Sequence, residues 1–316
     1  MKTHVDWLRY RTQSSPFEVL EVMRPSSIGG LLELGDQERG KDGWEWRRAL
    51  RIEDVTVGNI DYGGESQRGW SRVDMPAEGC KWVADWQGLH DGAMTLNRPE
   101  VKRLDLALDV FDGSVSHERT TAAYDAGGFT NRGRTPKARE ILPKNGGDGR
   151  TFYVGRREGA RFFRCYEKGW EVWSKVPETA RCLVGEGMLP ARMMVRGHSI
   201  DPAHWYRCEI QLNMADGYCP PWHAVKLSDD YFAGVCPYFA QLVPDARRRF
   251  VQQVPDFTAK LELEASLEHL RVAYGGVIRA ALMAGLTEAQ VLNTITAERP
   301  SERLVKAGVL MLDATA

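Results

Sequence analysis

The stretch V-K-R-L-D-L-A-L-D-V-F, residues 101–111, decides the fold expected for this chain. Apolar side chains alternate there with acidic or small ones, namely Leu104, Leu106, Leu108 and Val110 with Asp105, Ala107 and Asp109. Successive side chains of a β-strand point to opposite faces of a sheet. The pattern therefore predicts a strand with one apolar face for the core and one face that carries two carboxylates.

Three further segments have the composition of strands. T-F-Y-V-G-R-R (residues 151–157) and R-F-F-R-C-Y-E-K-G (residues 161–169) are separated by E-G-A, a linker that suits a hairpin. H-W-Y-R-C-E-I-Q-L-N (residues 204–213) again alternates polar with apolar residues. Together with residues 101–111, these segments predict an antiparallel sheet.

The regions around these strands have distinct patterns. Residues 1–75 are rich in Gly, Trp and short β-prone runs, and residues 79–90 have the spacing of a short amphipathic helix. Ser116 is the expected N-cap of a helix over residues 117–124. The stretch 131–150, rich in Gly, Pro and Arg, is expected to be an irregular loop.

The last part of the chain is predicted to be helical. From Lys260 onward apolar residues approximate one helical stripe, which Gly285 ends. A second helix opens at Thr287, where T-E-A-Q has the spacing of a capping box.

These patterns predict an α+β fold, in which a curved antiparallel sheet carries the site on one face and helices cover the other. We expect a catalytic domain over residues 1–255, with an N-terminal β-rich part (1–98) and a motif-bearing core (99–225). Residues 256–316 are expected to form a C-terminal helical region.

Composition limits the classes of function. The chain has 316 residues, of which 43% are hydrophobic, and a formal net charge of -1, so affinity for nucleic acid would have to come from local basic patches. The six cysteines form no C-x-x-C pair, which favours reduced thiols. No secretory signal and no membrane-spanning stretch is visible, and we therefore expect a cytoplasmic protein without membrane contacts.

Three carboxylates could hold a divalent cation. Asp105 and Asp109 leave the same strand face about 13 Å apart along the chain, so twist or a bulge would be needed to bring both to one ion. Glu209 would add a third carboxylate if its strand lay beside theirs. Hard cations such as Mg²⁺ and Mn²⁺ prefer oxygen ligands. The alternative is that these residues are surface charges, with Glu209 paired to Arg207 or to a lysine.

Tyr166 is the candidate nucleophile. Alternation places it on one strand face with Arg164 and Lys168, two cations that could clamp a phosphodiester and favour the phenolate. Attack on phosphorus would produce a phosphotyrosine adduct. The alternative is an ordinary strand tyrosine between two solvated cations.

The order of four short motifs resembles that of the replication initiation factor family, which includes rolling-circle initiators of filamentous phages, plasmids and related mobile elements. The motifs are K-R-L-D-L-A-L-D-V, T-F-Y-V-G-R-R-E, R-C-Y-E-K-G and Y-R-C-E-I-Q-L, within residues 101–212. The N-terminal V-D-W-L and the closing helices are also similar to the phage branch.

The resemblance implies a metal-dependent enzyme that nicks and rejoins one DNA strand through a 5′-phosphotyrosine. It carries the nucleophile over onto Tyr166, with Arg164 and Lys168 as catalytic neighbours, and the metal site onto Asp105, Asp109 and Glu209. The expected partners are origin DNA, single-stranded or extruded as a hairpin, and the host helicase and polymerase; a homodimer is a further expectation. A relaxase that nicks a transfer origin is an alternative, because its chemistry is the same.

Basic residues could neutralise DNA phosphates at several places. The candidates are Arg132, Arg134, Lys137 and Arg139 in the loop, Arg156 and Arg157 after the second strand, and, with less weight, Arg247 to Arg249. A third function class is a non-catalytic regulator, because residues 278–295 have the spacing of a helix-turn-helix. Its second helix, however, lacks basic residues in its first turns and carries Glu288.

Overall fold

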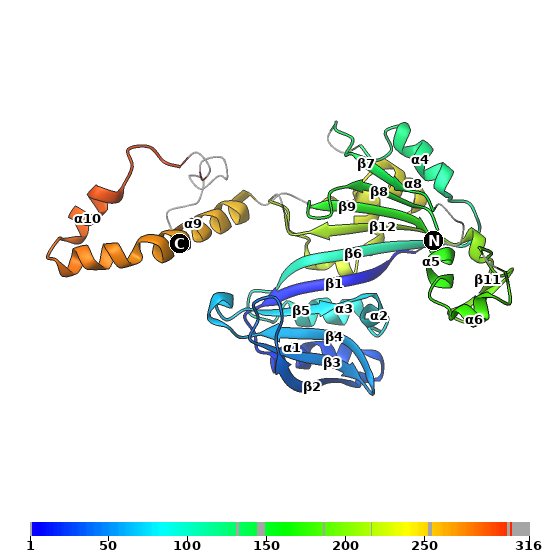
Figure 1. The fold of residues 1–316 in the computed structure, drawn as a ribbon, viewed down its shortest axis with the longest axis horizontal. Coiled ribbons are helices and arrows are strands. Elements are labelled where there is room, and N and C mark those ends of the chain that lie inside the picture. The colour runs from blue at the N-terminus through cyan, green and yellow to red at the C-terminus, as the bar shows by residue number, and fades with distance from the viewer. Residues whose placement is uncertain are drawn as a thin grey trace. The chain divides into compact units, whose positions relative to one another are not determined.

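The computed structural model describes residues 2–130, 133–143, 149–185, 187–215, 217–251, 255–301 and 304. Contacts divide the chain into two compact units, Met1–Val251 and Gln252–Ala316. The first unit is built on a large sheet, and the second consists of helices (Figure 1).

Ten strands form one antiparallel sheet in the order β2-β3-β4-β5-β1-β6-β12-β9-β8-β7, which confirms the predicted α+β class (Figure 1). The strands are β1 (His4–Thr12), β2 (Leu32–Arg39), β3 (Trp46–Ile52), β4 (Val55–Tyr62), β5 (Ser71–Met75), β6 (Glu100–Val110), β7 (Ala138–Ile141), β8 (Thr151–Gly155), β9 (Arg161–Glu167) and β12 (Tyr206–Asn213). A separate hairpin pairs β10 (Met193–Val195) with β11 (His198–Ile200). The decisive strand, β6, lies inside the sheet between β1 and β12.

Short helices surround this sheet. They are α1 (Pro16–Met23), α2 (Ala77–Cys80), α3 (Trp86–Ala93), α4 (His117–Asp125), α5 (Lys168–Trp173), α6 (Glu178–Arg181), α7 (Ser228–Gly234) and α8 (Pro237–Leu242). The 3-10 helices are η1 (Arg24–Ser26), η2 (Ile28–Gly30), η3 (Glu65–Gln67), η4 (Pro202–His204) and η5 (Trp222–Val225).

The apolar face of β6 forms the centre of the core. Leu104, Leu106 and Leu108 are completely buried, and each buried leucine contributes roughly 2 kcal/mol. Helix α7 packs on β1 and β6, α4 packs on β8 and β9, and Phe239 of α8 meets Phe163 of β9 edge to face with ring centres 5.3 Å apart. Because these helices take the apolar face, the charged residues of the central strands gather on the other one.

Several local predictions are confirmed. The side chain of Ser116 accepts a hydrogen bond from the backbone of Arg119 at the start of α4, and Thr287 caps the last described helix reciprocally with Gln290. The helix expected over residues 79–90 is instead two helices, α2 and α3, because the Asp85 side chain caps a new start at α3.

The expected loop over residues 131–150 is not wholly irregular. Within it, β7 pairs with β8 and forms the edge of the sheet. Its residues, A-R-E-I, are half-buried or exposed and show no apolar alternation, so the hydrophobic pattern could not reveal this edge strand.

The second unit contains α9 (Pro255–Met283) and α10 (Glu288–Ile295), which pack against each other. The predicted helical character of this region is confirmed. No helix among the described residues is long and apolar enough to cross a membrane.

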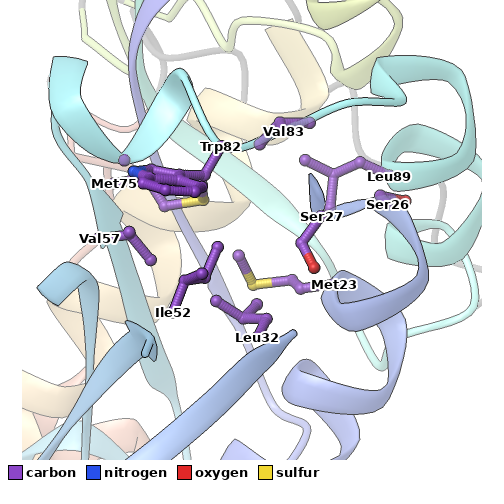
Figure 2. A pocket seen from close by; sticks show the side chains of 11 residues that line it. Met23, Ser26, Ser27, Leu32, Ile52, Val57, Met75, Trp82, Val83 and Leu89 are labelled. Carbon is purple, nitrogen blue, oxygen red and sulfur yellow. The ribbon is translucent and has the colours of Figure 1, made fainter. Parts of the chain in front are cut away.

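An apolar gap lies inside the N-terminal part of the first unit. Side chains from α1, β2, β3, β4 and α3, among them Met23, Leu32, Ile52 and Leu89, surround it (Figure 2). Its volume of about 10 Å³ is close to the minimum that holds one water molecule and far below the roughly 300 Å³ of a small-molecule site. This gap is therefore part of the core and not a ligand site.

Candidate active site

Three central strands bring the charged candidates together on the polar face of the sheet. Strand β12 lies between β6 and β9, so that Arg207 is the register partner of both Asp109 and Tyr166. Two residues further along, Glu209 faces Arg164. The sequence placed each of these residues on a polar strand face, and the sheet order joins those faces into one site.

Tyr166 lies between two of the predicted cations. The guanidinium carbon of Arg164 is 5.6 Å from the centre of the Tyr166 ring, and Lys168 Nζ is 5.5 Å from it. No hydrogen bond to the Tyr166 hydroxyl is found among the described residues. The phenol is thus held by its ring, next to cations on which a phosphate could bind.

The electrostatic effect on Tyr166 differs from the expectation that its neighbours favour the phenolate. Burial raises the pKa of Tyr166 well above its ordinary value, and the nearby Glu209 carboxylate raises it further, against the opposing charges of Arg207 and Arg164. Because desolvation outweighs the cations, Tyr166 keeps its proton at neutral pH and must lose it during any attack.

Lys168 reaches Tyr166 from a helix and not from the strand face that alternation predicted. Strand β9 ends at Glu167, and Lys168 opens α5. The next residue, Gly169, lies so close to Pro202 that a Cβ would be 1.9 Å from the Pro202 carbonyl oxygen, and its N–H donates to the Trp205 carbonyl at 3.2 Å. The glycine allows the start of α5, and with it Lys168, to lie close against the Pro202 backbone.

Arg207 is a fixed cation at the centre of the site. Its Nε and Nη2 each donate to Asp109 at 2.7 Å, and its Nη1 donates to Asp6 at 2.8 Å. Trp205 also donates to Asp109, at 2.9 Å. Burial by itself would raise the pKa of Asp109, but the hydrogen bonds and charge of Arg207 hold it below its ordinary value. Asp109 is therefore ionised and fully engaged in orienting Arg207.

Glu209 is the carboxylate that has one oxygen without a hydrogen-bond partner. It is 1% exposed, its Oε1 accepts from Arg164, and its Oε2 is buried without a partner. Burial raises the pKa of Glu209 to about 7, although Arg164 opposes the shift, and the negative charges of Asp105 and Asp6 add to it. Asp105, which pairs with Arg103, also has its pKa raised by burial. Both carboxylates would be stabilised by one more positive charge.

The three predicted metal ligands therefore do not behave alike. Among the described residues, no three His, Cys, Asp or Glu side chains gather closely enough to hold a metal ion by themselves. Asp109 has its oxygens occupied by Arg207 and Trp205, whereas Glu209 has an unpartnered buried oxygen. Both oxygens of Asp105 accept from Arg103, so Glu209 is the predicted ligand with an oxygen left for a cation, whose other ligands would be phosphate or water oxygens.

Two site residues were missed by the sequence analysis. His4 Nε2 lies 3.6 Å from Asp6 and 3.8 Å from Asp109, and Asp6 binds Arg207. A register shift between Val5 and Trp7 places Asp6 at an irregularity of β1. The signal was present in H-V-D-W, where two titratable residues alternate with an apolar one, but nothing local showed that β1 lies beside β6.

The predicted basic residues divide into two groups. Lys137, Arg139 and Arg157 line one pocket of about 340 Å³, together with Arg164. Arg134 and Arg156 are exposed outside that lining, and Arg132 lies outside the described residues. Arg247 to Arg249 are exposed, and Arg249 pairs with Asp230.

A second basic pocket, of about 470 Å³, was not foreseen. Its cations come from three strands and one turn: Arg9, Arg11, Arg72, Lys102, Arg103 and Arg157. Four of them pair with carboxylates, as Arg11 does with Glu100, while Lys102 contacts the Met214 sulfur. Burial, followed by the charge of Arg11, lowers the pKa of Lys102 to about 8.

Comparison with known proteins agrees with this arrangement. Residues 99–253 match the model of the family described as replication initiation factor. A solved structure, titled as a rolling circle replication initiator protein from Geobacillus stearothermophilus, has the same fold, with a TM-score of 0.53 at 19% identity over 80% of this chain and 98% of that one. No curated protein matched the sequence. The matched region holds β6, β9 and β12 with Tyr166, Glu209 and Arg207, and through residues 99–253 this chain belongs to the replication initiation factor family.

Proposed function

We propose that this chain initiates rolling-circle replication by cutting one strand of origin DNA, with Tyr166 as the nucleophile that remains joined to the 5′ phosphate. The observation that supports it is the position of Tyr166 between Arg164 and Lys168 and beside Arg207, on strands that the family model covers. The related Geobacillus fold, whose title names a rolling circle initiator, agrees with this proposal.

The reaction is a phosphoryl transfer at one phosphodiester. The Tyr166 oxygen forms a bond to phosphorus as the bond to the 3′ oxygen breaks, so one P–O bond replaces another. The phenol gives up its proton, and the departing 3′ oxygen takes one up. Arg164 and Arg207 neutralise the charge that builds on the phosphate oxygens, an effect that typically contributes several kcal/mol in such sites.

Lys168 is the proposed proton donor to the 3′ oxygen. Burial, followed by the charge of Arg207, lowers the pKa of Lys168, which makes its ammonium a better acid than an exposed lysine. The Glu171 carboxylate, which also binds Lys175, holds the Lys168 side chain in place. Lys168 would therefore be both oriented and poised to release a proton.

A divalent cation, Mg²⁺ or Mn²⁺, supplies charge neutralisation on a non-bridging phosphate oxygen when bound. Glu209 is the residue proposed to hold it, because its Oε2 is buried without a partner, and Asp105, which is bound by Arg103, would add negative charge nearby. Asp109 is assigned to orienting Arg207 instead.

The free 3′-OH left by the cut would be extended by the host polymerase behind the host helicase, in the cytoplasm. A second transfer at the regenerated origin would then close the displaced strand. The nucleophile for that transfer could be the 3′-OH itself, another tyrosine or a second copy of the chain.

The decisive experiment is the trapping of a covalent adduct. Single-stranded oligonucleotides that tile the DNA around the gene for this chain are incubated with the protein and Mg²⁺ or Mn²⁺, then resolved on a denaturing gel. We expect an adduct that Tyr166→Phe abolishes and that EDTA prevents. Tyr206→Phe is the matched control, since Tyr206 lies on the neighbouring strand but is buried among the apolar residues. An adduct that persists in Tyr166→Phe contradicts the proposal.

The same assay separates the alternatives. Nicking without any covalent species would favour a metal nuclease that uses the carboxylates alone. Tight binding of duplex origin without nicking would favour the regulator, although α10 begins with Glu288 and offers no basic residue. A relaxase is distinguished by a substrate from a transfer origin.

A further inference from the structure

We propose that the 340 Å³ pocket next to Tyr166 binds one unpaired nucleobase of the DNA strand to be cut. This inference rests on the proposed function and adds a subsite to it. Its lining residues lie on or beside β7, β8 and β9. These three strands form one edge of the sheet (Figure 1). Its volume is at the lower end of the range of about 300–1,000 Å³ found for small-ligand sites.

Two aromatic rings form the floor of the pocket. Tyr153 of β8 and Phe162 of β9 stack with ring centres 5.4 Å apart and only 12° between their planes. Both side chains are half-buried, so part of their ring surface stays accessible. The two rings stack on each other and Arg139 lies over Tyr153, so a base would extend this stack from the Phe162 side, because every base has a flat π-face.

Cations surround this aromatic floor. Four of the lining side chains are basic, none is acidic, and they are Lys137, Arg139, Arg157 and Arg164. The Arg139 guanidinium lies over the Tyr153 ring at 5.3 Å, and Arg164 pairs with Glu209. For Lys137, Arg139 and Arg157, no ion pair is found with any described residue. A base on the floor would thus have cations near the phosphates on both sides of it.

The space over Phe162 exists because its register partner is Gly155. Gly155 has a φ of +91°, and an added Cβ would lie 2.9 Å from the Arg161 carbonyl oxygen. At this position the chain requires glycine, and Gly155 itself places no side chain next to the Phe162 ring. The backbone conformation of the β8–β9 hairpin therefore helps to keep the pocket open.

Arg164 connects the pocket to the nucleophile. It lines the pocket, and its guanidinium lies 5.6 Å from the Tyr166 ring. Phe162, Arg164 and Tyr166 follow one another on the same face of β9, which puts Phe162 and Tyr166 about 13 Å apart along the strand. A base in the pocket would thus belong to a nucleotide close to the scissile phosphate and would fix the register of the strand.

The test compares two DNA chains of equal charge. Fluorescence anisotropy in EDTA measures binding of labelled (dT)12 and of a twelve-unit abasic chain, so no cutting occurs. We expect wild-type protein to bind (dT)12 about tenfold more tightly. Tyr153→Leu should lose most of this preference while still binding the abasic chain. Phe17→Leu is the matched control: Phe17 is an exposed ring beneath an arginine, Arg48, but lies on α1 and outside the pocket.

A second measurement does not depend on a variant. (dT)12 with 5-iododeoxyuridine at single positions is irradiated with wild-type protein, and the crosslinked peptide is expected to contain Tyr153 or Phe162. Equal affinity for both DNA chains, an unchanged preference in folded Tyr153→Leu, or crosslinks only elsewhere would overturn the proposal. Adduct formation is scored separately: if base preference depends on Tyr153 but no strand gives an adduct, the nicking assignment fails and the base site stands.

Discussion

Arg164 on β9 donates a hydrogen bond to Glu209 directly across from it on β12, while the other oxygen of Glu209 is buried without a partner. One arginine therefore compensates a carboxylate that is 1% exposed, and the pKa of Glu209 still rises to about 7 because burial outweighs the attraction. This pair connects the base pocket, the nucleophile and the proposed cation site.

The first prediction concerns the stability of this pair. Arg164→Met should lower the free energy of unfolding by about 3 kcal/mol at pH 8, because it leaves a buried, ionised carboxylate unpaired. The double variant Arg164→Met/Glu209→Gln should recover most of the loss. Urea denaturation of the wild type, both single variants and the double variant measures this coupling. A loss that the double variant does not recover would mean that Arg164 stabilises the sheet through other contacts.

The same pair predicts a pH dependence. Unfolding returns the pKa of Glu209 from about 7 to its ordinary, lower value. The folded state thus holds this proton more tightly, and its contribution to stability, complete at low pH, is lost as the pH rises toward 7. Arg164→Met should consequently cost less at pH 5 than at pH 8. Equal losses at the two pH values would contradict the assigned protonation of Glu209.

Lys168 and Lys175 offer a matched comparison of two lysines. Both bind the Glu171 carboxylate, but only Lys168 contacts the Tyr166 ring. Lys168→Met should slow adduct formation roughly 100-fold, the usual scale for loss of a proton donor, whereas Lys175→Met should leave the rate near that of the wild type. Single-turnover gels across pH 6–9 measure both. If the two variants behaved alike, the role of Lys168 would be structural.

Lys102 should make DNA binding sensitive to pH. Its pKa of about 8 means that its ammonium is lost as the pH rises through 8, where an ordinary lysine stays charged. Single-stranded DNA binding is measured at several salt concentrations. Between pH 7 and pH 9.5 the slope of log affinity against log salt should become shallower by about 0.7, the value for one phosphate contact. Lys102→Arg should remove this change, because arginine remains charged. A change that persists in the variant would assign it to another group.

The arginines that line the 340 Å³ pocket and the exposed run Arg247 to Arg249 should differ in their contribution to DNA binding. Arg139→Ala and Arg157→Ala should each reduce the slope of log affinity against log salt by roughly 0.7, because each removes one phosphate contact. Arg248→Ala, an exposed arginine outside the pocket linings, serves as the control and should leave the slope unchanged. A reduction in Arg248→Ala as large as in the others would indicate nonspecific loss of charge.

The local patterns of the sequence were sufficient for much of the fold. Alternation of apolar and polar residues is a property of single strands, and it identified β6, β8, β9 and β12 and the face on which Tyr166 lies. Capping by Ser116 and Thr287 is equally local, since the side chain binds the backbone three residues ahead. The sequence analysis did not predict the edge strand β7, because its residues pair with β8 without any alternation of apolar and polar side chains.

The sequence by itself determined which side chains share a polar strand face, because a strand repeats every two residues wherever it lies. Only the tertiary structure decided that β12 separates β6 from β9, and hence that Arg207 meets both Asp109 and Tyr166. It also decided that β1 contributes Asp6, and that burial raises the pKa of Tyr166 despite two flanking cations. Strand partners and desolvation depend on contacts between distant segments, and no local pattern specifies them.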